Sequence, residues 1–185
     1  MSMLMGIPTL LATNTHASDV SESQFESSID GTYDHYMFIF TDIHPVSAAR
    51  LLARVSTNGG SSYGVEKTSI FWLAHQREDA ADATEEYRTD RDMAGSTDEQ
   101  TIGYSLSADN DSSLGGELHL FHPANTTYSK QWTSHCSSMM ASSPNYAVQS
   151  SSGGYINNTA AVVAVSFEGS AGNIDSGVIQ MYGIA

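Results

Sequence analysis

The last segment of the chain is the sequence feature that constrains the fold most. Ala160 to Ile184 contains two strand-like runs joined by a turn of Gly, Asn, Asp and Ser. Val162 to Phe167 is apolar on both parities, which predicts a strand covered on both faces, and Val178 to Tyr182 has one polar position, Gln180. A buried strand pair at the C-terminus needs partner strands from earlier in the chain. We therefore expect a central hairpin that closes the fold through contacts distant in sequence.

A second central strand is predicted at Tyr33 to Thr41, where large apolar side chains occupy both parities. The dipeptide His44-Pro45 ends this strand, because proline lacks the N–H that a sheet ladder needs. Further along, Asn58 to Ser61 supplies the positive-φ residues of a tight hairpin. Arg77 to Thr97 is charged and breaks the strand pattern, so we expect a surface excursion with one helical turn at Ala80 to Glu86.

The complete chain reads as about ten short strands separated by turn residues, without a long helix. This pattern predicts an all-β fold, an antiparallel β-sandwich of jelly-roll-like topology. With 185 residues, the chain suits a single sandwich domain over residues 20–185, preceded by an apolar N-terminal arm over residues 1–19. Cys136 is the only cysteine, so no intrachain disulfide can form, and we expect a small buried side chain there.

The N-terminal arm provides the candidate residues for partner binding. It has no charged residue before Asp19, lacks Lys or Arg ahead of its apolar cluster, and contains Pro8, so we do not expect a signal peptide. The cluster is too short to span a bilayer, and no membrane partner is expected. Two interpretations remain open: the segment docks in a groove of a neighbouring subunit, or it is a first strand lying on its own domain. The candidate residues are Leu4, Met5, Ile7, Leu10 and Leu11.

The charge balance argues against a nucleic-acid partner. Seven Lys and Arg face 21 Asp and Glu, which gives a formal charge of −14, and the acidic residues are spread over the whole chain. Such a surface repels phosphate. It also keeps a protein soluble, whatever its function.

No cluster in the sequence indicates catalysis or metal binding. His119 and His122 are three residues apart on a predicted strand and should point to opposite faces. Asp109 and Asp111 begin a run that resembles a calcium loop, but Leu114 stands where such a loop needs glycine, which favours an ordinary acidic turn. No G-x-S-x-G elbow is present. We predict no catalytic, cofactor-binding or metal-ligating residue, and a protein that is not an enzyme.

Three stretches resemble a family of small bacteriophage virion proteins, many of them from aquatic phages. Gly172 to Ile184 is similar to the family's ending GNI-x-SG-x-I-x-x-YGI. Tyr33 to Pro45, together with Val55 to Tyr63, resembles its Y-x-x-Y-x-F-x-F-x-x-IHP strand and following S-T-D-G-G-S-x-Y turn, with Asn58 in place of Asp. Gly116 to Pro123 resembles its GELHLF-x-P. The likeness covers most of the chain from about residue 20 onward.

The resemblance implies a structural protein of a phage virion, made in the host cytoplasm. Within that class we predict a capsid decoration (cement) protein on the outer capsid surface. One compact domain without heptads or collagen-like repeats lacks the trimerising stalk of a fibre. Its expected partners are the major capsid protein and further copies of itself, with a trimer as one arrangement. The alternative is a tail or head-fibre module that binds host-surface glycan through aromatic side chains such as Trp72, Tyr87 or Trp132.

From the charge balance we predict that the protein does not bind duplex DNA at physiological salt, because the acidic surface repels the phosphate backbone. An electrophoretic mobility shift titration checks this expectation. A shift at micromolar protein that weakens steeply with added salt would contradict it and favour a position inside the capsid.

Overall fold

The structure is a computed structural model that describes residues 6–185, and this part of the chain is an all-β sandwich. Thirteen strands form two sheets, all strands pair antiparallel, and residues 6–185 contain no helix. The prediction of an antiparallel β-sandwich is therefore confirmed, with more strands than expected. The finer jelly-roll assignment stays a prediction.

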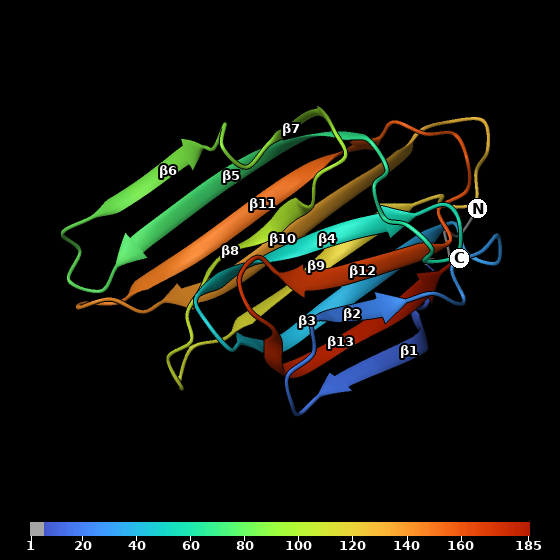
Figure 1. Cartoon of the computed structure of the whole chain (residues 1–185). Coiled ribbons are helices and arrows are strands. Elements are labelled where there is room, and N and C mark those ends of the chain that lie inside the picture. Colours follow the sequence, from blue (N-terminus) through green and yellow to red (C-terminus); the bar gives the residue numbers. More distant parts are fainter. Residues whose placement is uncertain (1–5) are drawn as a thin grey trace.

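The two sheets differ in size (Figure 1). The large sheet has nine strands, in the order β1 (Thr9–His16), β13 (Ile174–Ile184), β3 (His35–Pro45), β9 (Leu114–Phe121), β10 (Lys130–Met140), β11 (Tyr146–Ile156), β5 (Lys67–Arg77) and β6 (Ala83–Tyr87), with β7 (Met93–Ser96) also paired to β5. The small sheet has the order β2 (Glu22–Phe25), β12 (Ala164–Gly169), β4 (Ala49–Ser56) and β8 (Gln100–Leu106). Figure 1 shows the small sheet in front of the large one, with β1 and β6 at opposite edges.

The core lies between the sheets and is centred on aromatic side chains. Phe38 and Phe40 point inward from β3, and Phe167 meets them from β12 with ring centroids 5.2 and 5.0 Å away in edge-to-face geometry. Phe25 of β2 adds a centroid distance of 5.4 Å to Phe38. Edge-to-face pairs are favourable beyond the area they bury. The two predicted central strands, at Tyr33–Thr41 and Val162–Phe167, thus lie opposite each other across this core.

Small side chains bring the sheets close together where β8 crosses β10 and β11. Inward positions on β10 and β11 carry serines rather than large apolar residues, and two of their hydroxyls bond to the β8 backbone. Ser138 Oγ donates to the carbonyl of Tyr104 at 2.8 Å, and Ser150 Oγ donates to that of Ile102 at 3.1 Å. These bonds satisfy buried carbonyls on an edge strand, so β8 needs no further strand beside it.

The predicted C-terminal hairpin is wrong. β12 pairs with β2 and β4 in the small sheet, whereas β13 pairs with β1 and β3 in the large sheet. The turn after β12 therefore crosses between sheets, helped by Gly172 at φ 72°. Two apolar strands bury more surface when they face each other across a core than when they lie side by side, which favours this arch.

Two further local predictions need correction. The turn at Asn58 to Ser61 exists, with Gly59 and Gly60 at positive φ, but it leads from β4 in the small sheet to β5 in the large one rather than into a hairpin. The predicted helical turn is instead strand β6, which with β7 extends the sheet beyond β5. Pairing of β6 with the exposed edge of β5 outweighs the helix preference of the Ala and Glu residues in β6.

We predict that Phe167→Ala lowers the free energy of unfolding by about 3–5 kcal/mol, because it leaves a cavity among three aromatic rings. Urea denaturation measures this change. Phe121→Ala is the matched control, since Phe121 is 38% exposed on the outer face and its truncation should cost less than half as much. Equal losses from both variants would contradict the described core.

Candidate functional site

The space between the sheets is too small for a substrate. Its cavity measures about 30 Å³ and is lined largely by apolar side chains, among them Leu118, Leu120 and Trp132. That volume holds about one or two water molecules. The Nε1 atom of Trp132 is buried without a hydrogen-bond partner among the described residues, which suits a water here. Candidate sites in residues 6–185 therefore lie on the surface of the sandwich rather than between its sheets.

A groove of about 340 Å³ lies on the outer face of the large sheet, across β5, β11, β10 and β9. Strand register aligns one row of residues across it: Trp72 pairs with Ser151, Ser151 with His135, and His135 with Glu117. Ser151 belongs to a floor of small residues, which leaves the larger side chains of β5 and β9 as the two walls. The groove follows from register, because all these positions share one strand face.

An exposed aromatic pair forms the β5 wall. Trp72 is 44% exposed and stands edge-to-face with Tyr87 of β6 at a centroid distance of 5.4 Å. The Tyr87 hydroxyl donates to Asp92 Oδ2 at 2.6 Å. Ile70, 51% exposed, lies two residues from Trp72 on the same face. The Tyr87 contact limits the movement of the indole, which leaves a pre-positioned apolar surface open to solvent.

Hydrogen bonds position the polar side chains of the groove. The Gln149 amide lies 2.5 Å from His135 Nε2, and Ser151 Oγ lies 2.7 Å from His135 Nδ1, so both ring nitrogens are engaged. On the β9 wall, His119 Nε2 lies 3.3 Å from Glu117 Oε1. The carboxylate has lone pairs free for a ligand.

His35 hydrogen-bonds to His119 behind the β9 wall. Its Nε2 lies 2.7 Å from His119 Nδ1, and its ring stacks on Phe121 at a centroid distance of 4.8 Å. One ring nitrogen of this pair donates and the other accepts, according to the tautomers of the two imidazoles. Burial lowers the pKa of His35, and the neighbouring His119 lowers it further. The two imidazoles therefore lie in contact behind Glu117.

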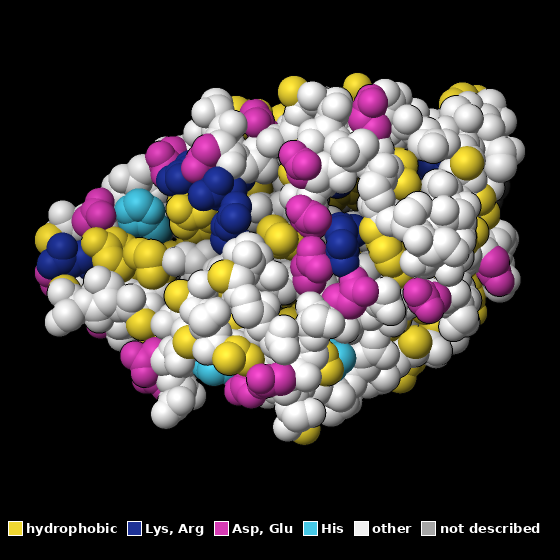
Figure 2. Space-filling view, viewed as in Figure 1, with side chains coloured by type: hydrophobic (Ala, Val, Ile, Leu, Met, Phe, Trp, Pro, Cys, Tyr) yellow, Lys and Arg dark blue, Asp and Glu magenta, His cyan; other side chains and the backbone are white. Residues whose placement is uncertain are grey.

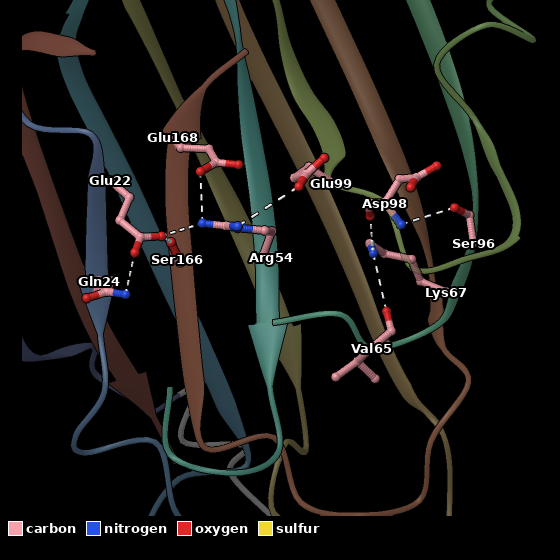
Figure 3. Close-up of polar contacts among 10 residues, drawn as sticks. All are labelled: Glu22, Gln24, Arg54, Val65, Lys67, Ser96, Asp98, Glu99, Ser166 and Glu168. Carbon is pink, nitrogen blue, oxygen red and sulfur yellow. Dashed lines mark hydrogen bonds and ion pairs between the residues drawn. The ribbon is translucent and has the colours of Figure 1, made fainter. Parts of the chain in front are cut away.

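An ion cluster lies on the outer face of the small sheet. Arg54 of β4 contacts Glu22 of β2 and, at 2.8 Å, Glu168 of β12, while Glu99 lies 3.9 Å away on its other side (Figure 3). Ser166 donates to Glu22 Oε2 at 2.7 Å. On the face drawn in Figure 2, basic side chains form small groups bordered by Asp and Glu. The guanidinium thus links three strands of the sheet, which is a structural role.

Two buried lysines also serve the fold. Lys130 is 1% exposed and donates to the carbonyls of Asn158 and Ala160 at 3.1 and 2.5 Å. Lys67, 3% exposed, donates to the carbonyls of Val65 and Asp98. Burial lowers the pKa of both lysines. Each ammonium group holds loops together at one end of the sandwich and is too deeply buried to contact a ligand.

Of the predicted partner-binding residues, Leu10 and Leu11 lie in β1, and Ile7 lies just before it. Leu4 and Met5 lie outside the described residues. Ile7 is 83% exposed and Leu10 51% exposed, whereas Leu11 is half-buried and packs against the core. The open question about this segment has a partial answer: from Thr9 onward it is a strand, β1, on its own domain.

The expected exposure of the three aromatic candidates for glycan binding is confirmed for two of them. Trp72 and Tyr87 are exposed, but Trp132 is 5% exposed and points into the core, so its prediction is wrong. Trp132 and Cys136 lie on the same face of β10, and that face points into the core. Cys136 is the small buried side chain expected, and burial raises its thiol pKa to about 12.

The other polar candidates stay separate. His119 lies on the outer face of the sheet, whereas His122 follows β9 and lies 3.1 Å from Asp34. The acidic turn around Asp109 and Asp111 lies near His44, whose Nε2 is 3.3 Å from the Asp109 carbonyl. Residues 6–185 contain no group of three or more His, Cys, Asp or Glu arranged to hold a metal ion. They also contain no helix long and apolar enough to cross a membrane.

Sequence reasoning missed the groove as a unit. Its walls come from strands more than forty residues apart, since Trp72 belongs to β5 and Glu117 to β9. The one signal in the sequence was alternation: Ile70 and Trp72 share a parity opposite to Phe71 and could be placed on one face. Which strands lie beside that face depends on sheet order, which no local pattern records.

Comparisons with known protein families, with curated proteins and with solved structures find no match for this chain. The candidate sites are therefore defined by the geometry of the chain itself.

We predict that Glu168→Gln makes stability less dependent on pH. Burial raises the pKa of Glu168 above its ordinary value of 4.5, an effect that Arg54 opposes and Glu99 and Glu22 reinforce. Between 4.5 and the raised value, the folded state holds a proton that the unfolded state has released. The free energy of unfolding therefore decreases as pH rises through this window.

The neutral amide of the variant binds no proton in this window but still accepts a hydrogen bond from Arg54. The free energy of unfolding should therefore decrease less with rising pH in the variant. Urea denaturation between about pH 4 and pH 7 measures it. Glu85→Gln, on the exposed strand β6, is the matched control and should keep the wild-type slope. An unchanged slope in Glu168→Gln would refute the coupling.

Proposed function

We propose that this chain is a non-enzymatic structural protein of a phage virion, a decoration protein that stabilises the outer capsid surface and attaches through the edge of β1. The observation that carries the proposal is an open, uncharged sheet edge bordered by exposed apolar side chains. Its partners are the major capsid protein and neighbouring copies of the chain.

The other sheet edges have features that discourage strand addition. β8 has its carbonyls bonded by serines of the facing sheet. β2 is four residues long and carries Glu22. β6 carries Glu85 and Glu86. Short length and charge are standard protections of an edge strand.

β1 lacks such protection. It is eight residues long with the sequence TLLATNTH, and no strand of residues 6–185 pairs with its outer edge. Burial lowers the pKa of His16, which disfavours the charged form of this residue. An unprotected edge of this length favours pairing with a strand of another chain.

Two exposed apolar side chains lie at the same place. Ile7 and Leu10 are 83% and 51% exposed, next to the open edge. Burying such a side chain contributes about 1.5–3 kcal/mol, and a contact repeated over a capsid lattice gains further from multivalency. The acidic surface, with its formal charge of −14, suits the outside of the shell rather than contact with packaged DNA. The resemblance to phage virion proteins supports the same class.

A tail or head-fibre module that binds host-surface glycan is the second candidate function. The exposed Trp72 beside the polar groove favours it. The two candidates use different surfaces, since the groove lies on β5 to β9 and the open edge lies at β1.

We predict that Leu10→Lys weakens attachment to the capsid by about tenfold or more, because it places a charge at the open edge and removes an apolar contact. Particles stripped of the protein are mixed with wild type or variant, and occupancy and resistance to heat are measured. Val46→Lys is the matched control, since Val46 is a similarly exposed aliphatic residue, 46% against 51%, in the loop after β3.

Equal occupancy for Leu10→Lys, Val46→Lys and wild type would refute attachment through β1. Binding of the wild type to tails or host cells alone would favour the second candidate. A deletion variant that tests the segment before β1 should end at Pro8, because removing residues 1–12 would also remove the first half of β1.

A further inference from the structure

We propose that the groove on the outer face of the large sheet binds a neutral oligosaccharide, with Trp72 as the stacking platform and Glu117 as the hydrogen-bonding group. This inference is independent of attachment through β1, which uses another part of the same sheet.

The dimensions of the groove suit a short oligosaccharide. Trp72, Ser151, His135 and Glu117 are successive partners on four neighbouring strands. Three strand spacings separate the Trp72 and Glu117 backbones by roughly 14 Å. A ligand that touches both walls must be longer than one sugar ring and must lie flat on the floor, where Gly153, paired with Ile70, leaves room.

The two walls offer the two kinds of contact that a sugar requires. A pyranose has an apolar C–H face, which packs on an aromatic ring, and a rim of hydroxyls, which donate and accept hydrogen bonds. The indole of Trp72, supported by Tyr87, supplies the first. A few polar groups placed around an apolar surface are the usual composition of a small-molecule site.

The polar groups are already held in place before a ligand binds. Ser151 and Gln149 hydrogen-bond to the His135 ring, and the His119 ring, itself hydrogen-bonded to His35, lies 3.3 Å from the Glu117 carboxylate. Groups fixed in advance lose little entropy on binding. The Glu117 carboxylate can then accept charge-assisted hydrogen bonds from the hydroxyl groups of the sugar.

The charge of the protein selects against acidic sugars. Glu117 is the carboxylate of the groove, and the whole chain carries a formal charge of −14. Uronic or sialic acid units would meet repulsion at close range. The chemical class is therefore a neutral oligosaccharide, such as those on cell-surface polysaccharides.

The test is titration of the full chain with maltotriose, cellotriose and tri-N-acetylchitotriose, followed by tryptophan fluorescence and by the indole N–H signals in NMR spectra. The chain has two tryptophans, and Trp132 is buried, so it serves as an internal reference. We expect at least one trisaccharide to bind with a Kd of about 1 mM or tighter and to move the Trp72 signal alone. Trigalacturonic acid should bind more weakly.

Trp72→Ala should weaken binding by about tenfold or more, and Glu117→Gln by a smaller factor. Tyr128→Ala is the control, because Tyr128 is a 71% exposed aromatic outside the groove and its loss should leave the Kd unchanged. The proposal is overturned if none of the three sugars moves the Trp72 signal, if Trp72→Ala binds as well as wild type, or if the acidic sugar binds most tightly. Leu10→Lys should bind sugar normally, which separates this outcome from failure of capsid attachment.

Discussion

The contact between Phe167 and the aromatic side chains of β3 is the interaction on which the rest of the structure depends. Phe167 comes from the small sheet, Phe38 and Phe40 come from the large one, and all three are almost completely buried. This packing fixes which face of β3 points inward. Because side chains alternate along a strand, it also fixes the outward positions of β3 and, through strand register, those of the whole large sheet. The groove on that outer face is thus a consequence of the core.

Small residues determine the other half of the sandwich. The serines of β10 and β11 let β8 approach closely and satisfy its carbonyls, so one sheet edge is closed without another strand. β1 has no such protection, because neither a charged side chain nor a hydroxyl from the facing sheet blocks its outer edge. The contrast between the two edges explains why we place the intermolecular contact at β1. It also separates this contact from the groove, so one protein can attach to a particle and present a ligand site elsewhere.

The sequence predicted features that depend on neighbours along the chain. The run of apolar residues on both parities identified the strand at Tyr33 to Thr41, the chemistry of a lone cysteine predicted the buried Cys136, and turn chemistry located Gly59 and Gly60. It failed where pairing between distant segments decides the outcome. The run at Val162 to Phe167 was expected beside the last strand but faces it across the core. Alternation indicates which residues of a strand share a face, but it does not indicate which strands or sheets lie beside that face. For this reason the sequence did not predict the groove, and it wrongly placed Trp132 on the surface.

The account is tested most directly by locating the chain on the virion at a resolution that shows strands, by cryo-electron microscopy of intact particles. Our account predicts density for the sandwich on the outer capsid surface, with a strand or loop of the shell against the outer edge of β1 and the Trp72 groove facing solvent. Density at the tail, or on the capsid with β1 exposed and another face against the shell, would contradict it.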